Sequence, residues 1–373
     1  MSPQLEIQLI AMVVAAACAL PGTFLVLRRM AMMSDAISHT VLLGIVLAFF
    51  VVQELGHPLL MIGATAVGVL TVTLTEALNR TRLVKEDAAI GLVFPALFSI
   101  AVILIGVFAR NVHLDEHVVF QGELAFAPFD RVVIFGTDIG PRTLVVMSVV
   151  LLLNLFFITL FYKELKLATF DEQLAAAFGF RPTLLHYGLM TLVSVTAVGA
   201  FDAVGSILVI ALMIVPPAAA YLLTDRLPWV LALSVAIGVV SAISGYWLAR
   251  ALNTNIGGAM VTMLGVLFGL IFLFSPDRGI IAVARRRLRQ KWEFAQIMLA
   301  VHLLHHEGRP EAQAENRVDH LSEHLRWEPD FAAKAVTYAE HEGTIQRVNG
   351  HLTLTPRGRT LARQAMTQQQ LPS

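Results

Sequence analysis

The hydrophobic positions of this chain fall into long, nearly unbroken runs. A run of about 20 apolar residues is the length that an α-helix needs to cross a bilayer. Runs of that length occur at about 5–27, 31–53, 58–78, 88–109, 142–162, 183–201, 203–223, 228–250 and 256–275. Only "FDAVG" separates the sixth run from the seventh, so eight full spans with one broken or re-entrant helix remain an alternative to nine. We therefore expect residues 1–280 to form an all-α polytopic membrane domain of about 8–9 transmembrane helices.

The pattern changes after residue 285, where charged residues become frequent. Helical patterns cover about 291–307, 311–326, 329–342 and 356–367, and two short alternating strands flank Asn349-Gly350. Asn-Gly favours a type I′ hairpin turn. Three helices, a hairpin and a helix outline a winged helix, and "HEGTIQRVNGHLTLTPRGRTLARQAM" resembles the wing and following helix of metal-dependent repressor-type domains. We expect residues 285–373 to form a small α+β winged-helix domain.

Composition agrees with a membrane protein and restricts its chemistry. The chain is 57% hydrophobic and only 14% charged, with a mean hydropathy of +0.71, outside the range of soluble domains. Its single cysteine, Cys18, lies inside an apolar run, so a disulfide framework, a thiolate metal cluster and a redox motif are excluded. Any metal chemistry must use oxygen and imidazole ligands.

Basic residues between the runs predict the orientation, because cytoplasmic loops are enriched in Lys and Arg. Alternate loops carry Arg28 and Arg29, then Arg80, Arg82 and Lys85, then Lys163, Lys166 and Arg181, then Arg226, then Arg278 and the stretch 285–289. The opposite loops carry a thinner set. We expect the first run to be a retained span, the N-terminus to lie outside and the C-terminal domain to be cytoplasmic.

Two polar residues interrupt the second run, "MMSDAISHTVLLGIVLAFF". Asp35 and His39 are four residues apart, so their side chains share one helical face. Ionisable residues inside a span are costly and are functional candidates by default. A carboxylate with an imidazole suits Zn²⁺, Mn²⁺ or Fe²⁺ rather than Mg²⁺ or Ca²⁺. Spacing alone leaves an alternative, in which Asp35 caps the helix and His39 bonds a neighbouring helix.

Two long loops also contain candidate residues. In the inner loop, "KELKLATFDEQLAAAFGFRP", we predict a short amphipathic helix that Asp171 caps and that Gly179 and Pro182 end. The outer loop contains "HLDEH", which places His113, Asp115 and His117 at alternate positions and predicts a metal relay if the segment is extended. An interfacial helix and a solvated polar loop are the respective alternatives.

Several segments together resemble one family. "GTFLVLRRMAMMSDAISHTVLLGIVLAFF" is similar to the second-span region of the permeases of ABC importers for manganese, zinc and iron. "KEDAAIGLVFPALFSIAVILI", "YKELKLATFDEQLAAAFGF", "FDAVGSILVIALMIVPPAAAYLLTDRL" and "GYWLA" follow in that family's order. The resemblance covers residues 1 to about 280.

The resemblance implies a type II ABC importer-like fold in the bacterial inner membrane. It implies a second permease subunit (identical or different), two cytoplasmic ATPase subunits and an extracytoplasmic metal-binding protein. Asp35 and His39 would line the metal pathway. The inner-loop helix would be the coupling helix that contacts the ATPase, through Phe170, Asp171, Glu172, Leu174 and Gly179. The divalent metal is then the cargo, and no permanently bound cofactor is expected.

The chain has no "GxxxxGK[ST]" phosphate loop, so we expect it to be a transport subunit that does not hydrolyse ATP itself. Pro216-Pro217 would kink the seventh run, as gating segments often do. Asp202 is a further ligand or, as we favour, an interface residue. Glu86-Asp87 suits the N-terminus of the fourth span.

The C-terminal domain contains seven of the twelve histidines. His305, His306, His320 and His324 predict a cytoplasmic metal sensor if they cluster, and ordinary surface histidines if they do not. From residue 290 onward there are nine Lys or Arg against ten Asp or Glu, so nucleic acid is an unlikely partner. Two alternatives to metal import remain, a metal-chelate permease for haem or a siderophore and a membrane-anchored metal-responsive regulator.

Overall fold

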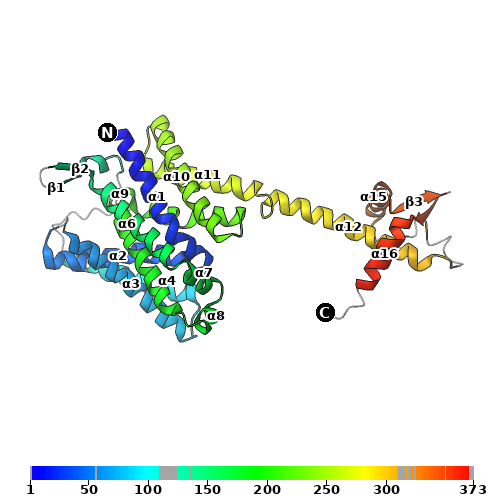
Figure 1. The fold of residues 1–373 in the computed structure, drawn as a ribbon, viewed down its shortest axis with the longest axis horizontal. Coiled ribbons are helices and arrows are strands. Elements are labelled where there is room, and N and C mark those ends of the chain that lie inside the picture. The colour runs from blue at the N-terminus through cyan, green and yellow to red at the C-terminus, as the bar shows by residue number, and fades with distance from the viewer. Residues whose placement is uncertain are drawn as a thin grey trace. The chain divides into compact units, whose positions relative to one another are not determined.

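Figure 1 shows the computed structural model of the chain, which divides into two compact units, Met1–Gly279 and Ile280–Ser373. The structure describes residues 2–54, 57–108, 124–134, 137–309, 316–317, 321, 325–348 and 350–368. We call the first unit the membrane unit and the second the C-terminal unit, and we describe each by itself.

The membrane unit is built almost entirely of helices. They are α1 (Pro3–Leu27), α2 (Ala31–Val52), α3 (Pro58–Arg80), α4 (Glu86–Phe108), α6 (Arg142–Leu160), α7 (Tyr162–Phe170), α8 (Glu172–Ala177), α9 (Pro182–Leu223), α10 (Leu227–Leu252) and α11 (Ile256–Phe274). Within the described residues, nine segments are long and apolar enough to cross a bilayer, and α9 supplies two of them. These segments agree with the nine predicted runs.

Helix α9 is two spans joined at a break. Gly205 has φ 74° and ψ 162°, which is non-helical and accessible to glycine without a steric penalty. The two segments of α9, Pro182–Phe201 and Ala203–Leu223, are 20 and 21 residues long, and Gly205 lies in the first turn of the second. Each half therefore has spanning length, and the structure favours nine spans over eight.

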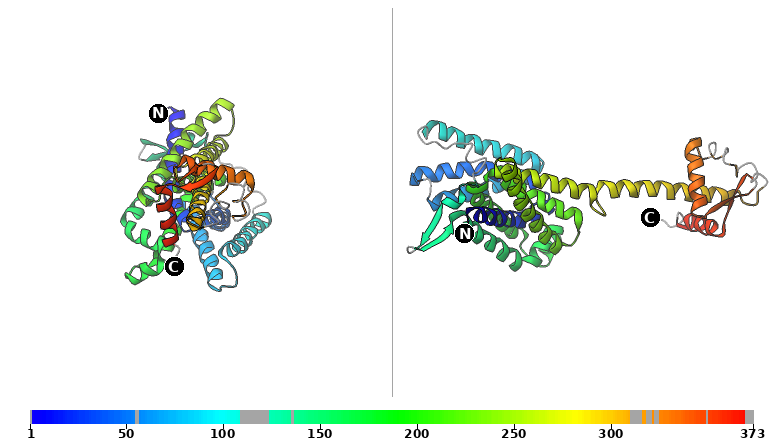
Figure 2. Two further views of the ribbon diagram at one scale, coloured as in Figure 1. Left: turned by 90° about the vertical axis from the view of Figure 1, so that its right-hand side faces the viewer. Right: turned by 90° about the horizontal axis from the view of Figure 1, so that it is seen from above.

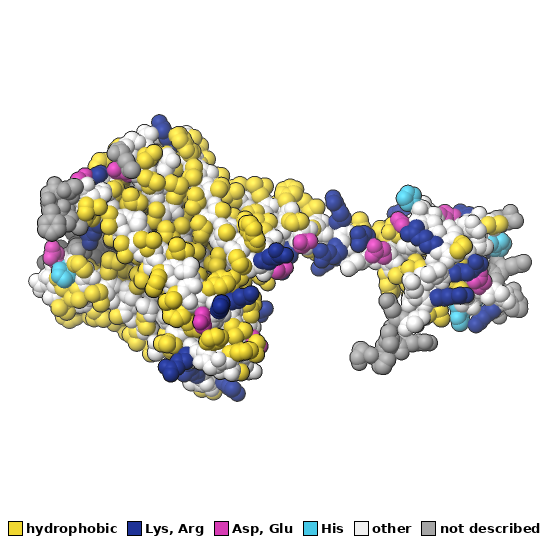
Figure 3. Space-filling model, viewed as in Figure 1, with side chains coloured by type: hydrophobic (Ala, Val, Ile, Leu, Met, Phe, Trp, Pro, Cys, Tyr) yellow, Lys and Arg dark blue, Asp and Glu magenta, His cyan; other side chains and the backbone are white. Residues whose placement is uncertain are grey.

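Helix α1 and the first half of α9 are the most buried spans, whereas α4, α6 and α11 leave most of their surfaces outside the core. Figure 2 shows the helices of the membrane unit bundled together, and Figure 3 shows hydrophobic side chains over most of the visible face of that unit. Glycine permits the closest contacts: a Cβ at Gly22 would lie 2.0 Å from the carbonyl oxygen of Met213. Small residues at helix contacts are the usual route to tight packing within lipid.

Two connections of the membrane unit have structure of their own. One is a 3₁₀ turn, η1 (Ala127–Phe129), followed by the antiparallel hairpin β1 (Arg131–Ile134) and β2 (Thr137–Pro141), with an irregularity between Val132 and Val133. The other is α7–α8. Helix α7 begins two residues after the end of α6. The sequence analysis predicted only the helix after Asp171, because the polar residues of α7 are equally common in loops.

The C-terminal unit consists of α12 (Ile280–His306), α15 (Pro329–His341), the hairpin β3 (Ile345–Val348) and β4 (His351–Leu354), and α16 (Pro356–Gln368). Its core joins all five through buried aliphatic side chains, among them Leu299, Val336 and Leu352. Gly350 has φ +85°, as a tight hairpin turn requires. A small α+β unit is therefore confirmed.

One helix of this unit starts earlier than predicted, and part of another predicted segment lies outside the described residues. Helix α12 begins at Ile280 rather than near residue 291, because the Arg and Ala residues of its first turns favour helix, whereas the sequence prediction treated this run of charges as a connection. Most of the helix predicted at 311–326, and Asn349 of the predicted turn, lie outside the described residues.

Candidate functional site

The pair of polar residues in α2 lies on one helical face. The Nε2 atom of His39 is 3.5 Å from the Oδ1 atom of Asp35, and the two side chains are 30% and 34% exposed. This distance exceeds that of a normal N–H···O bond. Both groups remain reachable from outside the chain, so the pair presents one imidazole nitrogen and one carboxylate to whatever occupies that space.

Two phenylalanines of α4 hold the His39 ring. Phe94 stacks on it with ring centroids 5.6 Å apart and an angle of 27°, and Phe98 meets it edge-on at 5.8 Å and 77°. Such contacts fix the plane of the imidazole and form an apolar wall beside it. The sequence reading missed these residues. Their spacing of four puts them on one face of α4, but nothing in the sequence shows that this face meets α2.

The neighbouring face of α2 is buried and tied to other spans. Ser34 donates a hydrogen bond to the sulfur of Met213 at 3.2 Å, and Thr40 and Thr71 share a hydroxyl contact of 2.7 Å between α2 and α3. Ser38 donates to the carbonyl of Ser34 within its own helix. These contacts settle the rotation of α2, and therefore the direction in which Asp35 and His39 point.

Within the part of the chain that the structure describes, no three His, Cys, Asp or Glu side chains gather closely enough to hold a metal ion. Asp35 and His39 thus offer two ligands and no more from the described residues. The predicted outer relay, His113, Asp115 and His117, lies outside the described residues, as do His320 and His324. The side chain of Asp202 is likewise outside the description.

The predicted coupling segment has a defined local structure. Asp171 caps α8 by accepting a hydrogen bond from the Leu174 amide at 2.8 Å, and Gly179 has φ +83° just after the helix. Phe170, Leu174 and Phe178 are 61%, 43% and 69% exposed. A groove of about 570 Å³ runs beside Phe170, with Lys163 and Lys166 at its edge. The segment therefore presents an apolar, rigid surface with basic neighbours.

Two other predicted features fall on described residues. Pro216 and Pro217 lie within α9, and its non-helical residue is Gly205, so a kink at the prolines stays a prediction. His305 and His306 end α12, where the His306 ring is 4.8 Å from that of His302 and 5.4 Å from that of His305.

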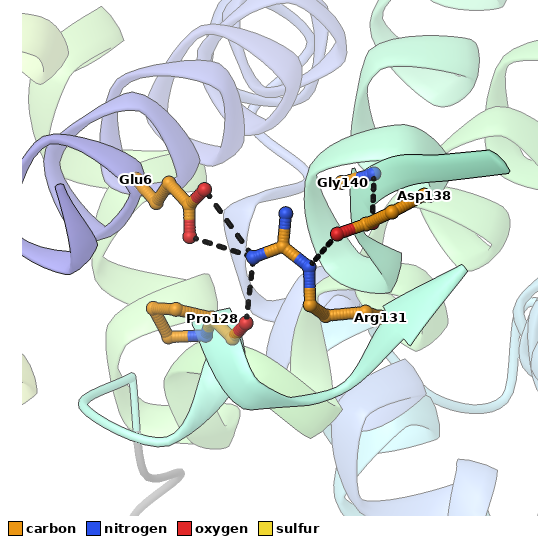
Figure 4. Close-up of polar contacts among 5 residues, drawn as sticks. All are labelled: Glu6, Pro128, Arg131, Asp138 and Gly140. Atoms are coloured by element: carbon orange, nitrogen blue, oxygen red, sulfur yellow. Dashed lines mark hydrogen bonds and ion pairs between the residues drawn. The ribbon is translucent and has the colours of Figure 1, made fainter. Parts of the chain in front are cut away.

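A second cluster of charges lies at the start of α1 (Figure 4). Glu6 is only 4% exposed, and both its oxygens accept from Nη1 of Arg131, at 3.4 and 3.3 Å. The Nε of Arg131 donates to Asp138 at 2.6 Å, and this hydrogen bond raises the pKa of Arg131. The cluster ties the β1–β2 hairpin to α1. Sequence reasoning missed it because its members are 125 positions apart.

In the part of the chain that the structure describes, nine apolar segments of spanning length, one of them with a carboxylate–imidazole pair, define a polytopic membrane protein. Residues 5–275 match the family model described as the ABC 3 transport family, so the chain belongs to that family. The metal ABC permease family that the sequence resembled is thereby confirmed.

Named relatives agree with this family. The zinc transport system membrane protein TroD of Treponema pallidum (strain Nichols) is 48% identical over 358 residues, covering 96% of this chain and 97% of the relative. The manganese transport system membrane protein MntD of Bacillus subtilis (strain 168) is 51% identical over 282 residues, covering 76% and 95%. The solved structure of PsaBC from Streptococcus pneumoniae in complex with Fab has a TM-score of 0.62 at 28% identity, covering 74% of this chain and 94% of that one.

The two sequence alignments differ in extent. A match over 358 residues must continue far into the C-terminal unit, whereas 282 residues correspond to little more than the membrane unit. The similarity to TroD therefore includes most of the C-terminal unit.

Proposed function

We propose that the chain is the permease subunit of an ABC importer that moves Mn²⁺, Zn²⁺ or Fe²⁺ across a bacterial inner membrane, with Asp35 and His39 as ligands of the passing ion. The observation that carries the proposal is the pair itself: an imidazole nitrogen and a carboxylate oxygen 3.5 Å apart, one-third exposed, within an apolar span. Relatives named for zinc and manganese transport support the choice of cargo.

Two ligands suit passage better than retention. A structural zinc site closes four protein ligands around the ion, and such a site holds its metal tightly. A second permease subunit carrying an equivalent pair would complete four ligands between two chains, with water supplying the rest for an ion of higher coordination number. The incomplete sphere on one chain lets the ion enter and leave.

We infer the other subunits of the importer from the missing phosphate loop and from the exposed α7–α8 segment. Without a phosphate loop in its sequence, this chain depends on ATPase subunits, which we place against α7–α8, where Phe170, Asp171, Glu172, Leu174 and Gly179 cluster. An extracytoplasmic metal-binding protein delivers the ion, with His113, Asp115 and His117 as the relay on that side. The N-terminus then lies outside and the C-terminal unit, which we propose to be a regulatory winged helix, lies in the cytoplasm.

Uptake of isotopically labelled Mn²⁺, Zn²⁺ and Fe²⁺ by cells or proteoliposomes carrying Asp35→Ala or His39→Ala tests the proposal. We expect each variant to lose at least about tenfold in uptake, since each removes half of the chain's ligands. Membrane insertion and binding to the ATPase should be unchanged. The matched control is Ser38→Ala on the same helix, whose hydroxyl bonds only its own backbone among the hydrogen bonds described.

Parental uptake by either variant would disprove the pathway role. Uptake of a metal chelate without uptake of the free ions would instead favour a chelate permease.

A further inference from the structure

The α7–α8 segment meets the spans at a polar cavity of about 500 Å³. Its walls come from the end of α1, the start of α2, the last turns of α3, the start of α4 at Glu86, α7–α8 and the start of α9. Its lining residues include Arg28, Met33, Glu76, Thr169, Glu172 and His186. We call it the Arg28 cavity. It brings the predicted ATPase contact and the helix that carries Asp35 and His39 to one place.

Arg28 connects the two sides of this cavity. Its Nε donates a hydrogen bond to the hydroxyl of Thr169 on α7 at 3.1 Å. Thr169 comes directly before Phe170 and two residues before the Asp171 cap. Burial lowers the pKa of Arg28, and the negative charge of Glu172 on α8 opposes that shift. The guanidinium is thus held by α7 and by the charge at the start of α8.

The charge of Arg28 is only partly satisfied in this arrangement. Among the residues that the structure describes, its Nη2 is buried with no hydrogen-bond partner, and so is Oε2 of Glu76, which lines the same cavity. Glu76 is itself held by Arg80, which donates to its Oε1 at 2.6 Å, and by a hydrogen bond with Tyr187. The buried guanidinium nitrogen therefore favours a movement that brings it to an acceptor, and Glu172 and Glu76 supply carboxylates in the same cavity.

Arg28 is also connected to α2 through the backbone. Its amide donates a hydrogen bond to the carbonyl of Phe24 in α1, and α2 begins three residues later, where the Met33 amide donates to the carbonyl of Met30. Met33 lines the cavity, and Asp35 follows two positions on. Ser34 contacts Met213, against whose backbone Gly22 of α1 packs. Helices α1, α2 and the second half of α9 therefore form one packed body near the site.

We propose that Arg28 is a positioning residue of transport, which passes the position of the α7–α8 segment to the first turn of α2 and so to Asp35 and His39. The inference rests on the proposed function. When α7–α8 shifts, the hydrogen bond between Arg28 and Thr169 moves the α1–α2 turn with it. The Nη2 atom of Arg28 can then bind the carboxylate of Glu172 or that of Glu76 as the cavity changes shape.

The test uses the full complex in lipid, with its ATPase and metal-binding protein. We expect Arg28→Gln to keep ATP hydrolysis within about twofold while the metal carried per ATP falls at least about fivefold, because the charge-assisted link is lost. Arg28→Lys should recover part of the coupling. Thr169→Val removes only the hydroxyl that accepts the bond from Arg28, and it should lower the metal carried per ATP about two- to threefold. This variant replaces Arg28→Gln in the test if Arg28→Gln does not fold. The matched control is Arg29→Gln, the adjacent exposed arginine of the same turn.

A second readout does not depend on the cargo. Spin labels at Met32 on α2 and Gln173 on α8, both exposed, report the distance between the two segments, and Cys18 is fully buried and does not compete for label. We expect ATP to leave this distance nearly constant in the parental and Arg29→Gln complexes, because the Arg28–Thr169 bond moves both segments together, and to change it in Arg28→Gln. A distance that stays equally constant in Arg28→Gln would overturn the inference. Failure of the parental complex to move metal would instead contradict the proposed function, while the label distances would still decide the role of Arg28.

Discussion

The membrane unit contains two acid–base groups that look alike in the sequence and differ in how far their side chains are exposed. Buried Glu6 receives two contacts from Arg131, which in turn bonds Asp138 and the carbonyl of Pro128. Asp35 and His39 share one contact of 3.5 Å and stay one-third exposed. A group whose charges neutralise each other within the chain stabilises the fold. A group that remains accessible within a span is arranged for a ligand from outside it.

Arg131→Leu should produce the largest change in stability. It leaves the Glu6 carboxylate, which is only 4% exposed, without its cation, and an uncompensated buried charge lowers the stability of the folded state. The expected result is a lower melting temperature of the purified protein in lipid, with metal transport per folded molecule retained. Asp35→Asn should show the reverse, with transport lost and melting unchanged.

The double variant Glu6→Gln with Arg131→Leu is the control, because it removes the stranded charge and should recover most of the lost stability. If the double variant melts as low as Arg131→Leu alone, the loss of stability comes from lost packing of the hairpin. The charge of Arg131 would then not stabilise the fold, and the contrast with Asp35 and His39 would be wrong.

Phe98→Leu should have a smaller effect, on transport rather than on stability. An aromatic contact contributes roughly 0.5–1.5 kcal/mol beyond its buried area, so a freed His39 ring should weaken metal recognition about two- to tenfold. The measurement is the metal concentration for half-maximal uptake. Phe108→Leu is matched to it, because Phe108 also meets α2 edge-on, at Phe50 with centroids 6.1 Å apart, away from the pair. Equal effects of both substitutions would mean that α4 supports α2 generally and does not orient His39.

The sequence was sufficient where structure follows from neighbours along the chain. Apolar runs located the nine spans, a spacing of four put Asp35 and His39 on one face, and Asp171 and Gly179 bounded α8 as expected. Each of these depends on helical geometry alone.

What the sequence could not supply depends on which elements meet. Phe98 faces His39 only because α4 lies against α2, and Glu6 finds Arg131 only because the hairpin folds back on α1. Gly205 is one of 25 glycines, and its left-handed conformation cannot be read from its type. The Arg28–Thr169 bond likewise joins residues 141 positions apart.

An exposed ion pair in the C-terminal unit should contribute less to stability than the pair at Glu6. Arg359 contacts Glu307 with its Nε and Nη2, the latter at 2.6 Å, and this pairing lowers the pKa of Glu307. A carboxyl whose pKa is lowered by folding stabilises the folded state above its unfolded pKa, about 4.3, and loses that contribution as the pH falls through its folded value. We expect Arg359→Leu to speed hydrogen exchange of α16 only about twofold at pH 7, because exposed pairs contribute little.

Compared with the parental protein at the same pH, this difference should shrink below about pH 4 and in 1 M salt, where screening shortens the range of charge interactions to about 3 Å. Glu307→Gln should match Arg359→Leu, and combining them should add nothing further. A difference that persisted at low pH would show that Arg359 acts through its aliphatic stem. The charge itself would then contribute nothing here, in contrast to the pair at Glu6, where removing the cation leaves a carboxylate that is only 4% exposed without its partner.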